Sequence, residues 1–207
     1  MKKIAIVGSA AIEKDESSLI DSCDLVVRFN NCKVYGGHSG KKLDILCINV
    51  GGAPACQMVA ETTVLKSSFY SLISEIWIPI QTKVCQAHMM GWNLSDPRID
   101  ASDLSDEIIK SNKLGHLPTV RFSTEFNIRV FEMLRKRDGN FVSPSTGFLA
   151  IQYVVDESRF AEWDKLIFGF AFKGWKGHPF AAEEKLVLQY AAERQDVKFF
   201  HPKEIAL

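Results

Sequence analysis

The chain has 207 residues, of which 46% are hydrophobic and 24% are charged, and this composition excludes a disordered or collagen-like protein. Its 25 Lys and Arg residues balance its 25 Asp and Glu residues, so the formal net charge is zero. Zero net charge disfavours non-specific binding to nucleic acid or to an anionic membrane, although a local basic pocket for a small anion stays open. The length fits a single domain spanning residues 1–207.

The five cysteines are odd in number and form no Cys-x-x-Cys pair. Three of them, Cys23, Cys47 and Cys56, lie in apolar runs. This pattern predicts reduced, partly buried thiols in a cytosolic protein and gives no support to a zinc site. No segment reaches the ~18 apolar residues of a membrane span, and the apolar run near the N-terminus is too short for a signal peptide. We therefore expect a cytoplasmic protein.

In the first part of the chain, short apolar runs bounded by turn residues predict strands over Lys3–Val7, 24–29, 44–48 and 75–80. Pro79 places the end of the last of these near a sheet edge. We interpret residues 81–118 as an irregular lid or acceptor-facing loop that includes a helix near 103–110.

In the second part, apolar residues at helical spacing and short apolar runs predict a helix over 123–137, a helix over 146–155, a strand over 165–170, a helix over 179–193 and a strand over Val197–Phe200. Strands that alternate with helices are typical of an α/β fold with a mostly parallel sheet and helices on both faces. The expected architecture is one Rossmann-like nucleotide-binding domain.

Two turns could hold a ligand at the carboxyl ends of strands, where parallel sheets bind their ligands. Gly8 and Ser9 follow the first strand, and they form either a phosphate-binding turn or a plain strand–loop junction. The dinucleotide pattern G-x-G-x-x-G is absent because position 10 is Ala, which disfavours a nicotinamide cofactor. Asn30 follows the second strand and suits a base, ribose or phosphate, although its residue type alone favours a simple turn former.

Two further candidates lie near the starts of helices. Ser145, Thr146 and Gly147 open an apolar helix, where they form either an anion site or an ordinary helix cap. His178 precedes the next helix and is either a general base or a structural histidine. Glu183 lies within the apolar arc of that helix, so it either has a buried partner or complements the helix dipole.

Taken together and in order, these segments resemble the sialyltransferases of the animal Golgi type, with their L, S and VS motifs. Residues 20–30 read I-D-S-C-D-L-V-V-R-F-N and resemble the I-D-S-H-D-x-V-x-R-x-N of the L motif. Residues 144–147 read P-S-T-G, as in the S motif, and His178 and Glu183 match the H-x-x-x-x-E of the VS motif. The similarity covers both ends of the chain, whereas residues from about 50 to 140 match nothing in the family.

This resemblance implies an α/β fold, a CMP-activated sugar donor and no metal or other cofactor. It implies that Asn30 contacts the nucleotide, that Ser145, Thr146 and Gly147 hold the CMP, and that Gly8 and Ser9 complete the donor site. His178 would take the proton from the acceptor hydroxyl, and Glu183 would support the VS loop or the donor. The chain departs from the family at Ser9, where Asn is usual, and it lacks motif III and the cysteine pair of the animal enzymes.

We therefore expect a short, bacterial-like member: an inverting, metal-independent glycosyltransferase. It would transfer sialic acid or a related keto-acid sugar from a CMP-sugar to a glycan acceptor, without nucleic acid, either in the cytoplasm or peripheral to the inner face of the membrane. The alternative from another class is a non-catalytic nucleotide-sugar-binding protein of the same fold. A dinucleotide-binding Rossmann protein is a further enzyme alternative, which the Ala at position 10 opposes.

Overall fold

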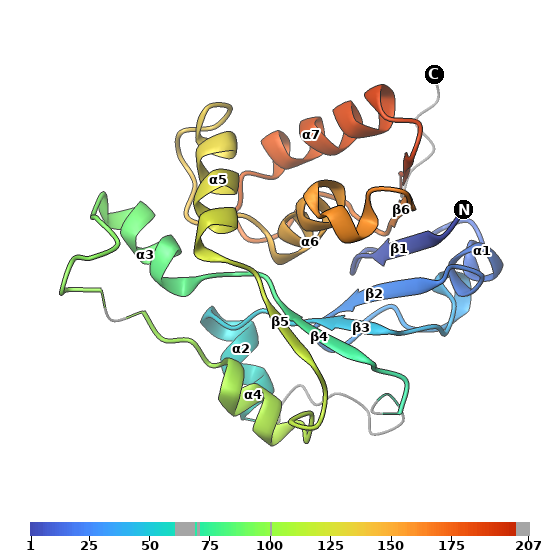
Figure 1. The fold of residues 1–207 in the computed structure, drawn as a ribbon, viewed down its shortest axis with the longest axis horizontal. Helices are drawn as coiled ribbons and strands as arrows, with labels where there is room; N and C mark the ends of the chain where they lie inside the picture. Colours follow the sequence, from blue (N-terminus) through green and yellow to red (C-terminus); the bar gives the residue numbers. More distant parts are fainter. Residues whose placement is uncertain (61–68, 70, 100, 202–207) are drawn as a thin grey trace.

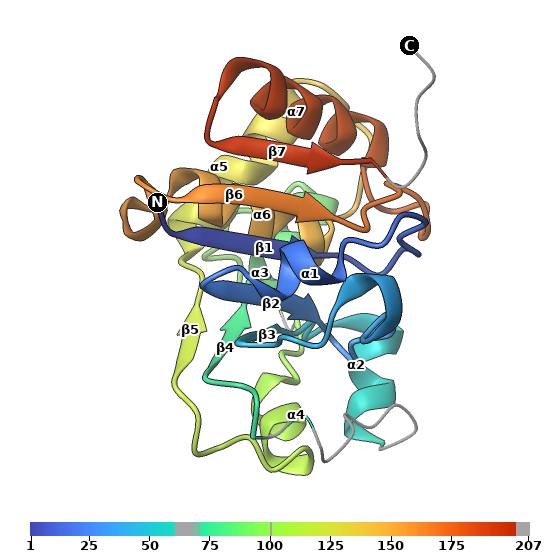
Figure 2. The ribbon, with the colours of Figure 1, turned by 90° about the vertical axis from the view of Figure 1, so that its right-hand side faces the viewer.

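The computed structural model describes residues 1–60, 69, 71–99 and 101–201. Within these residues one sheet of seven parallel strands has the order β5-β4-β3-β2-β1-β6-β7 (Figures 1 and 2). The strands are β1 (Lys3–Val7), β2 (Leu25–Phe29), β3 (Ile45–Cys47), β4 (Glu75–Ile78), β5 (Thr119–Arg121), β6 (Asp164–Phe168) and β7 (Val197–Phe200). The predicted α/β fold with a parallel sheet is thereby confirmed.

All six predicted strands are present, but on the far side of the sheet one expectation was wrong and one strand was not predicted. Pro79 does not mark an edge, because β4 lies between β3 and β5. The actual edge strand, β5, was not predicted, because its three residues include a single apolar side chain, Val120, and its first and last residues are exposed. The strand predicted over 165–170 ends at Phe168, where Gly169 adopts a positive φ of 67° and turns the chain.

Seven helices and two short 3₁₀ turns surround the sheet in the described part of the chain. They are α1 (Ser17–Asp21), η1 (Gly37–Ser39), α2 (Gly52–Val59), α3 (Thr82–Met90), α4 (Ser105–Ser111), α5 (Thr124–Arg135), α6 (Thr146–Asp156), η3 (Ser158–Phe160) and α7 (Phe180–Glu193). Helices α1, α2 and α4 lie on one face of the sheet, and α3, α5, α6 and α7 lie on the other (Figures 1 and 2). The predicted helix near 103–110 corresponds to α4. The irregular structure expected for the rest of 81–118 was wrong for α3, which covers nine residues.

Side chains of β1 alternate between two apolar clusters, as the pleat of a strand requires. Ile4 and Ile6 join the large core that includes α5, α6 and α7. Ala5 and Val7 join a smaller core together with Ile20 of α1. β1 is therefore buried on both faces, which explains its continuous apolar sequence. Among the described residues, no helix is both long enough and apolar enough to cross a membrane.

All five cysteines are free thiols, as expected, but their burial differs from the prediction at one position. Cys23, Cys32, Cys47 and Cys85 are buried, whereas Cys56 on α2 is exposed. The apolar neighbours of Cys56 misled the prediction, because the buried positions of α2 are Ala55 and Met58. Burial raises the pKa of the Cys23 and Cys85 thiols to about 11 and that of Cys32 to about 12.

Candidate functional site

A cleft of about 840 Å³ lies where the carboxyl ends of β1, β2 and β6 meet. Figure 2 shows these ends pointing in the same direction, and β2 and β6 flank β1 on opposite sides. The chain order thus reverses at β1, and such a switch point is where open α/β sheets bind their ligands. Seven predicted site residues line this cleft: Gly8, Ser9, Asn30, Ser145, Thr146, Gly147 and His178. The structure therefore brings together residues from the first and last thirds of the chain.

The turn after β1 is fastened to the turn after β6. The Gly8 amide donates to the Phe168 carbonyl at 2.8 Å, and the Ala10 amide donates to the Gly169 carbonyl at 2.9 Å. A Cβ atom at position 8 would collide with the Gly169 carbonyl oxygen, so only glycine allows this approach. Two amides that could have cradled a phosphate are thus already engaged. Gly8 serves the close contact of two turns, and the Ser9 side chain is left to the cleft.

Asn30 is a turn former, as its residue type favoured, and it also lines the cleft. Its φ of 48° is the left-handed conformation of a turn residue, which Asn adopts more readily than most residues. Its Oδ1 accepts a hydrogen bond from the Asn49 amide at 2.9 Å and so ties the end of β2 to the loop after β3. Among the described residues, no group accepts a hydrogen bond from its Nδ2. Asn30 therefore forms the turn and still presents an amide donor in the cleft wall.

The start of α6 forms a second wall. Ser145 caps the helix, since its Oγ accepts a hydrogen bond from the Phe148 amide at 3.1 Å. The amides of Thr146 and Gly147 belong to the first turn, where no intrahelical acceptor exists. A Cβ atom at position 147 would collide with the Phe170 ring, so glycine lets this cleft-lining aromatic ring pack against the helix start. The arrangement offers backbone donors, the Thr146 hydroxyl and the positive end of a helix dipole to an anion.

Glu183 lies behind this wall and is fully buried. Its carboxylate accepts hydrogen bonds from the Ser145 amide and the Ser145 Oγ, both at 2.7 Å. Burial raises the pKa of Glu183 to about 7, and the two bonds from Ser145 oppose this rise. Ser145 is therefore the buried partner that the position of Glu183 on an apolar helix arc suggested. Glu183 acts on the cleft through Ser145, because its own side chain has no exposed surface.

His178 lies on the loop between β6 and α7 and lines the cleft. Its Nδ1 lies 2.7 Å from the Ser143 carbonyl oxygen, which can only accept, so Nδ1 carries the proton. The neutral ring then has a lone pair on Nε2. Burial lowers the pKa of His178, and the rings of Trp175 and Phe180 pack against it with centroids 4.9 and 5.2 Å away. A neutral, oriented imidazole in a cleft is suited to accept a proton.

Two cleft residues, Lys33 and His201, carried no assigned role in the sequence, whereas the sequence suggests Trp175, Lys173 or Lys176 in place of the missing motif III. Lys33 and His201 enter the wall from segments that are far apart in the chain, and only the strand order brings them together. Trp175 is 58% exposed, and its ring covers the Cα of Gly177 so closely that a Cβ there would collide with it. The sequence offered one signal for Trp175, its position between glycines just before His178.

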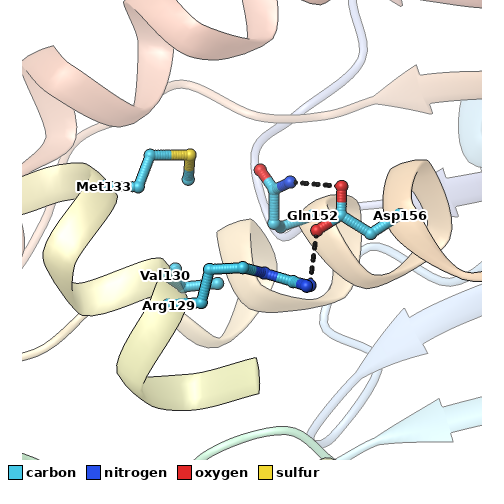
Figure 3. Close-up of a pocket in the computed structure, with 5 residues that line it drawn as sticks. All are labelled: Arg129, Val130, Met133, Gln152 and Asp156. Carbon is cyan, nitrogen blue, oxygen red and sulfur yellow. Dashed lines mark hydrogen bonds and ion pairs between the residues drawn. The ribbon is translucent and has the colours of Figure 1, made fainter. Parts of the chain in front are cut away.

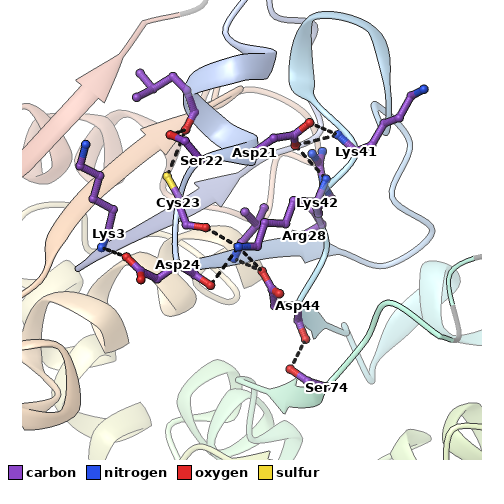
Figure 4. Close-up of polar contacts among 12 residues, drawn as sticks. Lys3, Asp21, Ser22, Cys23, Asp24, Arg28, Lys41, Lys42, Asp44 and Ser74 are labelled. Atoms are coloured by element: carbon purple, nitrogen blue, oxygen red, sulfur yellow. Dashed lines mark hydrogen bonds and ion pairs between the residues drawn. The ribbon is translucent and has the colours of Figure 1, made fainter. Parts of the chain in front are cut away.

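Two residues of the L-like motif, Asp21 and Arg28, stabilise the fold by hydrogen bonds to backbone groups. Arg28 is buried, and its guanidinium donates to the Lys42 carbonyl at 2.8 Å and to groups of Ser39 and Gly40. Asp21 accepts hydrogen bonds from the Lys41 and Lys42 amides, each at 2.8 Å; these contacts converge in Figure 4. These two motif residues therefore fix the loop after β2 against the sheet, whereas Asn30, two residues after Arg28, lines the cleft.

A second cavity of about 410 Å³ lies between α5 and α6 (Figure 3). Its polar side chains already bond to one another: Arg129 to Asp156 at 2.7 Å, and Gln152 to Asp156 at 2.8 Å. Tyr190 donates to Gln152 at 2.6 Å. This cavity is a packed helix interface with satisfied polar groups, and the cleft at the strand ends is the stronger candidate site. Among the described residues, no group of three or more His, Cys, Asp and Glu side chains could hold a metal ion.

Known structures share this architecture. A mammalian sialyltransferase superimposes with a TM-score of 0.57 at 18% sequence identity, covering 98% of this chain and 70% of that one. A mammalian sialyltransferase in complex with Gal-beta-1-3GalNAc-ortho-nitrophenol superimposes with a TM-score of 0.56 at 16% identity, with the same coverage of both chains. The chain thus has a sialyltransferase-like, glycosyltransferase-type fold.

A curated protein is similar over nearly the full length. The urease operon 23 kDa accessory protein of Rhizobium meliloti (strain 1021) is 28% identical over 204 residues, which cover 96% of this chain and 93% of that protein. No family model matches the chain. The similarity to solved structures therefore supports the fold of the chain.

Proposed function

We propose that the protein is an inverting, metal-independent glycosyltransferase that transfers sialic acid or a related keto-acid sugar from a CMP-sugar to a hydroxyl group of a glycan. His178 is the observation that carries the proposal. Its Nδ1 is bonded to the Ser143 carbonyl at 2.7 Å, so Nε2 is the free basic atom of a cleft-lining ring. The same cleft contains the start of α6, with the donors that an anionic leaving group needs.

The chemistry follows from these two walls. The acceptor oxygen bonds to the anomeric carbon while its proton passes to Nε2 of His178. The bond between that carbon and the phosphate oxygen breaks, and its electron pair leaves with CMP. The hydroxyl group of Thr146 and the first amides of α6 stabilise the departing phosphate, and Ser145, whose hydroxyl donates to Glu183, caps and positions that helix start. Because attack and departure occur on opposite sides of one carbon, the product has the inverted configuration.

The remaining predicted residues take supporting roles in this proposal. Ser9 and the Nδ2 of Asn30 contact the nucleotide, Gly8 allows the close contact of the turns after β1 and β6, and Gly147 lets the Phe170 ring pack against the helix start. Glu183 is a positioning residue, since it holds Ser145 by two hydrogen bonds of 2.7 Å. Motif III has no counterpart, and Lys173, Trp175 or Lys176 takes its part in assisting the leaving phosphate; Lys173 and Trp175 line the cleft.

The whole chain acts as one domain in this proposal, with a CMP-sugar and a glycan as its partners and no bound cofactor. It works in the cytoplasm or at the inner face of the membrane. A second candidate is a non-catalytic nucleotide-sugar-binding protein of the same fold, which is favoured by similarity to a protein named as a urease accessory protein. A donor hydrolysis assay separates the two, because a transferase releases some donor to water, whereas a binder leaves the CMP-sugar intact.

The first test is a thermal-shift titration with CMP, UMP, AMP, GMP and NAD, each with and without EDTA. A ligand that binds only the folded state stabilises it by ~2.7 kcal/mol when its concentration is about a hundred times its Kd. We expect a rise in Tm that is selective for CMP and insensitive to EDTA. No response to CMP, or a stronger response to NAD, would contradict the proposed donor.

A further inference from the structure

Exposed apolar side chains gather at the end of α3. Within the described residues, seven large hydrophobic side chains are exposed, and three of them lie here: Met89 and Met90, at 51% and 52%, and Leu94, at 40%. Trp92 lies between them and is half-buried, with the Arg98 guanidinium stacked 4.0 Å from its ring centroid. We call Met89, Met90, Trp92 and Leu94 the α3 tip. Single exposed apolar residues are ordinary, but a cluster on one protruding segment indicates a binding surface.

A run of exposed basic residues stands beside the α3 tip. Arg135, Lys136 and Arg137 follow one another at the end of α5. The residue before Met89, His88, contacts Arg135 through its Nδ1 and packs on Phe131 of α5 with ring centroids 4.7 Å apart. The ends of α3 and α5 are therefore in direct contact. Figure 1 shows α3 and the trace that follows it extending outward from the sheet, next to α5.

We propose that the α3 tip and the basic run at the end of α5 form one binding surface for an anionic lipid bilayer. Methionine and leucine side chains suit the boundary of the acyl region, and tryptophan prefers the headgroup level. Each Lys or Arg close to an anionic leaflet strengthens binding roughly fivefold. Since the chain has zero net charge, the attraction has to come from this local run.

The charges also argue against the main rival, a second copy of the same chain. A two-fold dimer that buried the α3 tip against itself would bring two copies of Arg135, Lys136 and Arg137 towards each other. Asp96 does not offset this repulsion, because its carboxylate is already paired with Arg98 at 2.7 Å. An anionic surface, by contrast, complements the whole patch. The proposal does not depend on the reaction proposed for the cleft.

Vesicle co-sedimentation tests the proposal with the full chain. Vesicles of phosphatidylcholine alone are compared with vesicles of equal parts phosphatidylcholine and phosphatidylglycerol, at low and high salt. We expect binding to the anionic vesicles that weakens with salt, and much weaker binding to phosphatidylcholine. If the chain does not sediment with the anionic vesicles at low salt, the proposal is wrong.

Three variants locate the surface. Replacing Met89, Met90 and Leu94 together by serine should weaken partition into anionic vesicles by roughly tenfold or more. The pair Lys136→Gln and Arg137→Gln should weaken it by roughly tenfold and reduce its salt dependence. The matched control replaces Leu72 and Leu188, which are exposed elsewhere at 39% and 42%, and should bind as the parent chain does.

Thermal unfolding must be unchanged in each variant, so that lost binding reports the surface and not the fold. Size-exclusion chromatography over a range of protein concentrations covers the rival occupant. A dimer that the serine variant abolishes would overturn the proposal, as would a serine variant that binds vesicles like the parent chain. A failed nucleotide titration leaves this experiment unaffected, so the two proposals fail separately.

Discussion

His178 is bonded to Ser143 through Nδ1, so a base role falls to Nε2. We expect His178→Ala to reduce turnover at least ~100-fold, because general-base catalysis contributes at least this much. The Tm rise produced by CMP should persist, since the helix start that we propose as the phosphate site is unchanged. Steady-state kinetics together with the thermal shift measure the two effects, and an unchanged turnover would remove His178 from the mechanism.

The pH profile adds an independent test of His178. Burial lowers its pKa below the ordinary value of 6.5, and a base is active only when it is unprotonated. The rate should therefore stay level as the pH falls from about 8 to about 6.5 and decline only at lower pH. An acid limb centred above the ordinary histidine pKa would mean that another group, or a protonated imidazole, controls the rate.

The raised pKa of the buried Glu183 should lower the free energy of unfolding as the pH rises. Its pKa is raised from 4.5 to about 7 in the folded protein, so the folded state binds the proton more tightly than the unfolded state does. Its contribution to stability is then fully present below about 4.5 and is lost as the pH rises through about 7. The loss amounts to about 3 kcal/mol.

Glu183→Gln should lack this pH-dependent loss while keeping an acceptor for the Ser145 amide. Urea unfolding of both proteins across this pH range gives the difference in the free energy of unfolding. The difference should grow in favour of the Gln variant as the pH rises. Parallel pH profiles for the two proteins would show that Glu183 is not buried as described.

At the scale of elements, the close contact of the turns after β1 and β6 requires a glycine at position 8. Gly8→Ala would place a Cβ atom against the Gly169 carbonyl oxygen, which belongs to the backbone and cannot move aside cheaply. We expect a loss of about 1–3 kcal/mol in the free energy of unfolding, typical of overpacking, and weaker CMP binding. Gly139→Ala is the matched control, because nothing lies within 4 Å of its added Cβ. Equal urea midpoints for the two variants would contradict the close approach.

Strongly patterned elements could be predicted from the sequence, and weakly patterned ones could not. The continuous apolar run of β1 and the spaced apolar residues of α5 carry their burial in the residue order. Edge strand β5 has little to bury, and α3 mixes polar and apolar residues, so neither had a clear period. Tertiary contacts decide such segments.

The same distinction holds for the cleft. Ser145 and Asn30 could be found because capping and turn formation are local properties that mark helix and strand ends. Lys33 and His201 could not, since their presence in the cleft depends on which strands become neighbours. Glu183 was found as a carboxylate in need of a partner, but its partner, Ser145, is 38 residues away in the chain.

At the scale of the whole molecule, thiol reactivity reports on the packing of both faces of the sheet. Cys56 is exposed, while the other four cysteines are buried and burial raises their pKa. The folded protein should therefore react with a thiol reagent at one site, and Cys56→Ser should abolish this fast phase. Denaturation should release the remaining four. Fast labelling of a second cysteine would contradict the described core.

The position of β1 between β2 and β6 has a consequence for synthesis on the ribosome. β1 is made before the other strands of the sheet, yet β6 on one of its sides is made only after five strands and six helices have appeared. Until then β1 presents an unpaired edge, which is a template for wrong pairing between nascent chains. The wall that contains His178 emerges later still. A chain halted before residue 164 would expose that edge and would lack the cleft wall that follows β6. We therefore expect translation pauses or chaperone access before β6 is made to govern the yield of native protein.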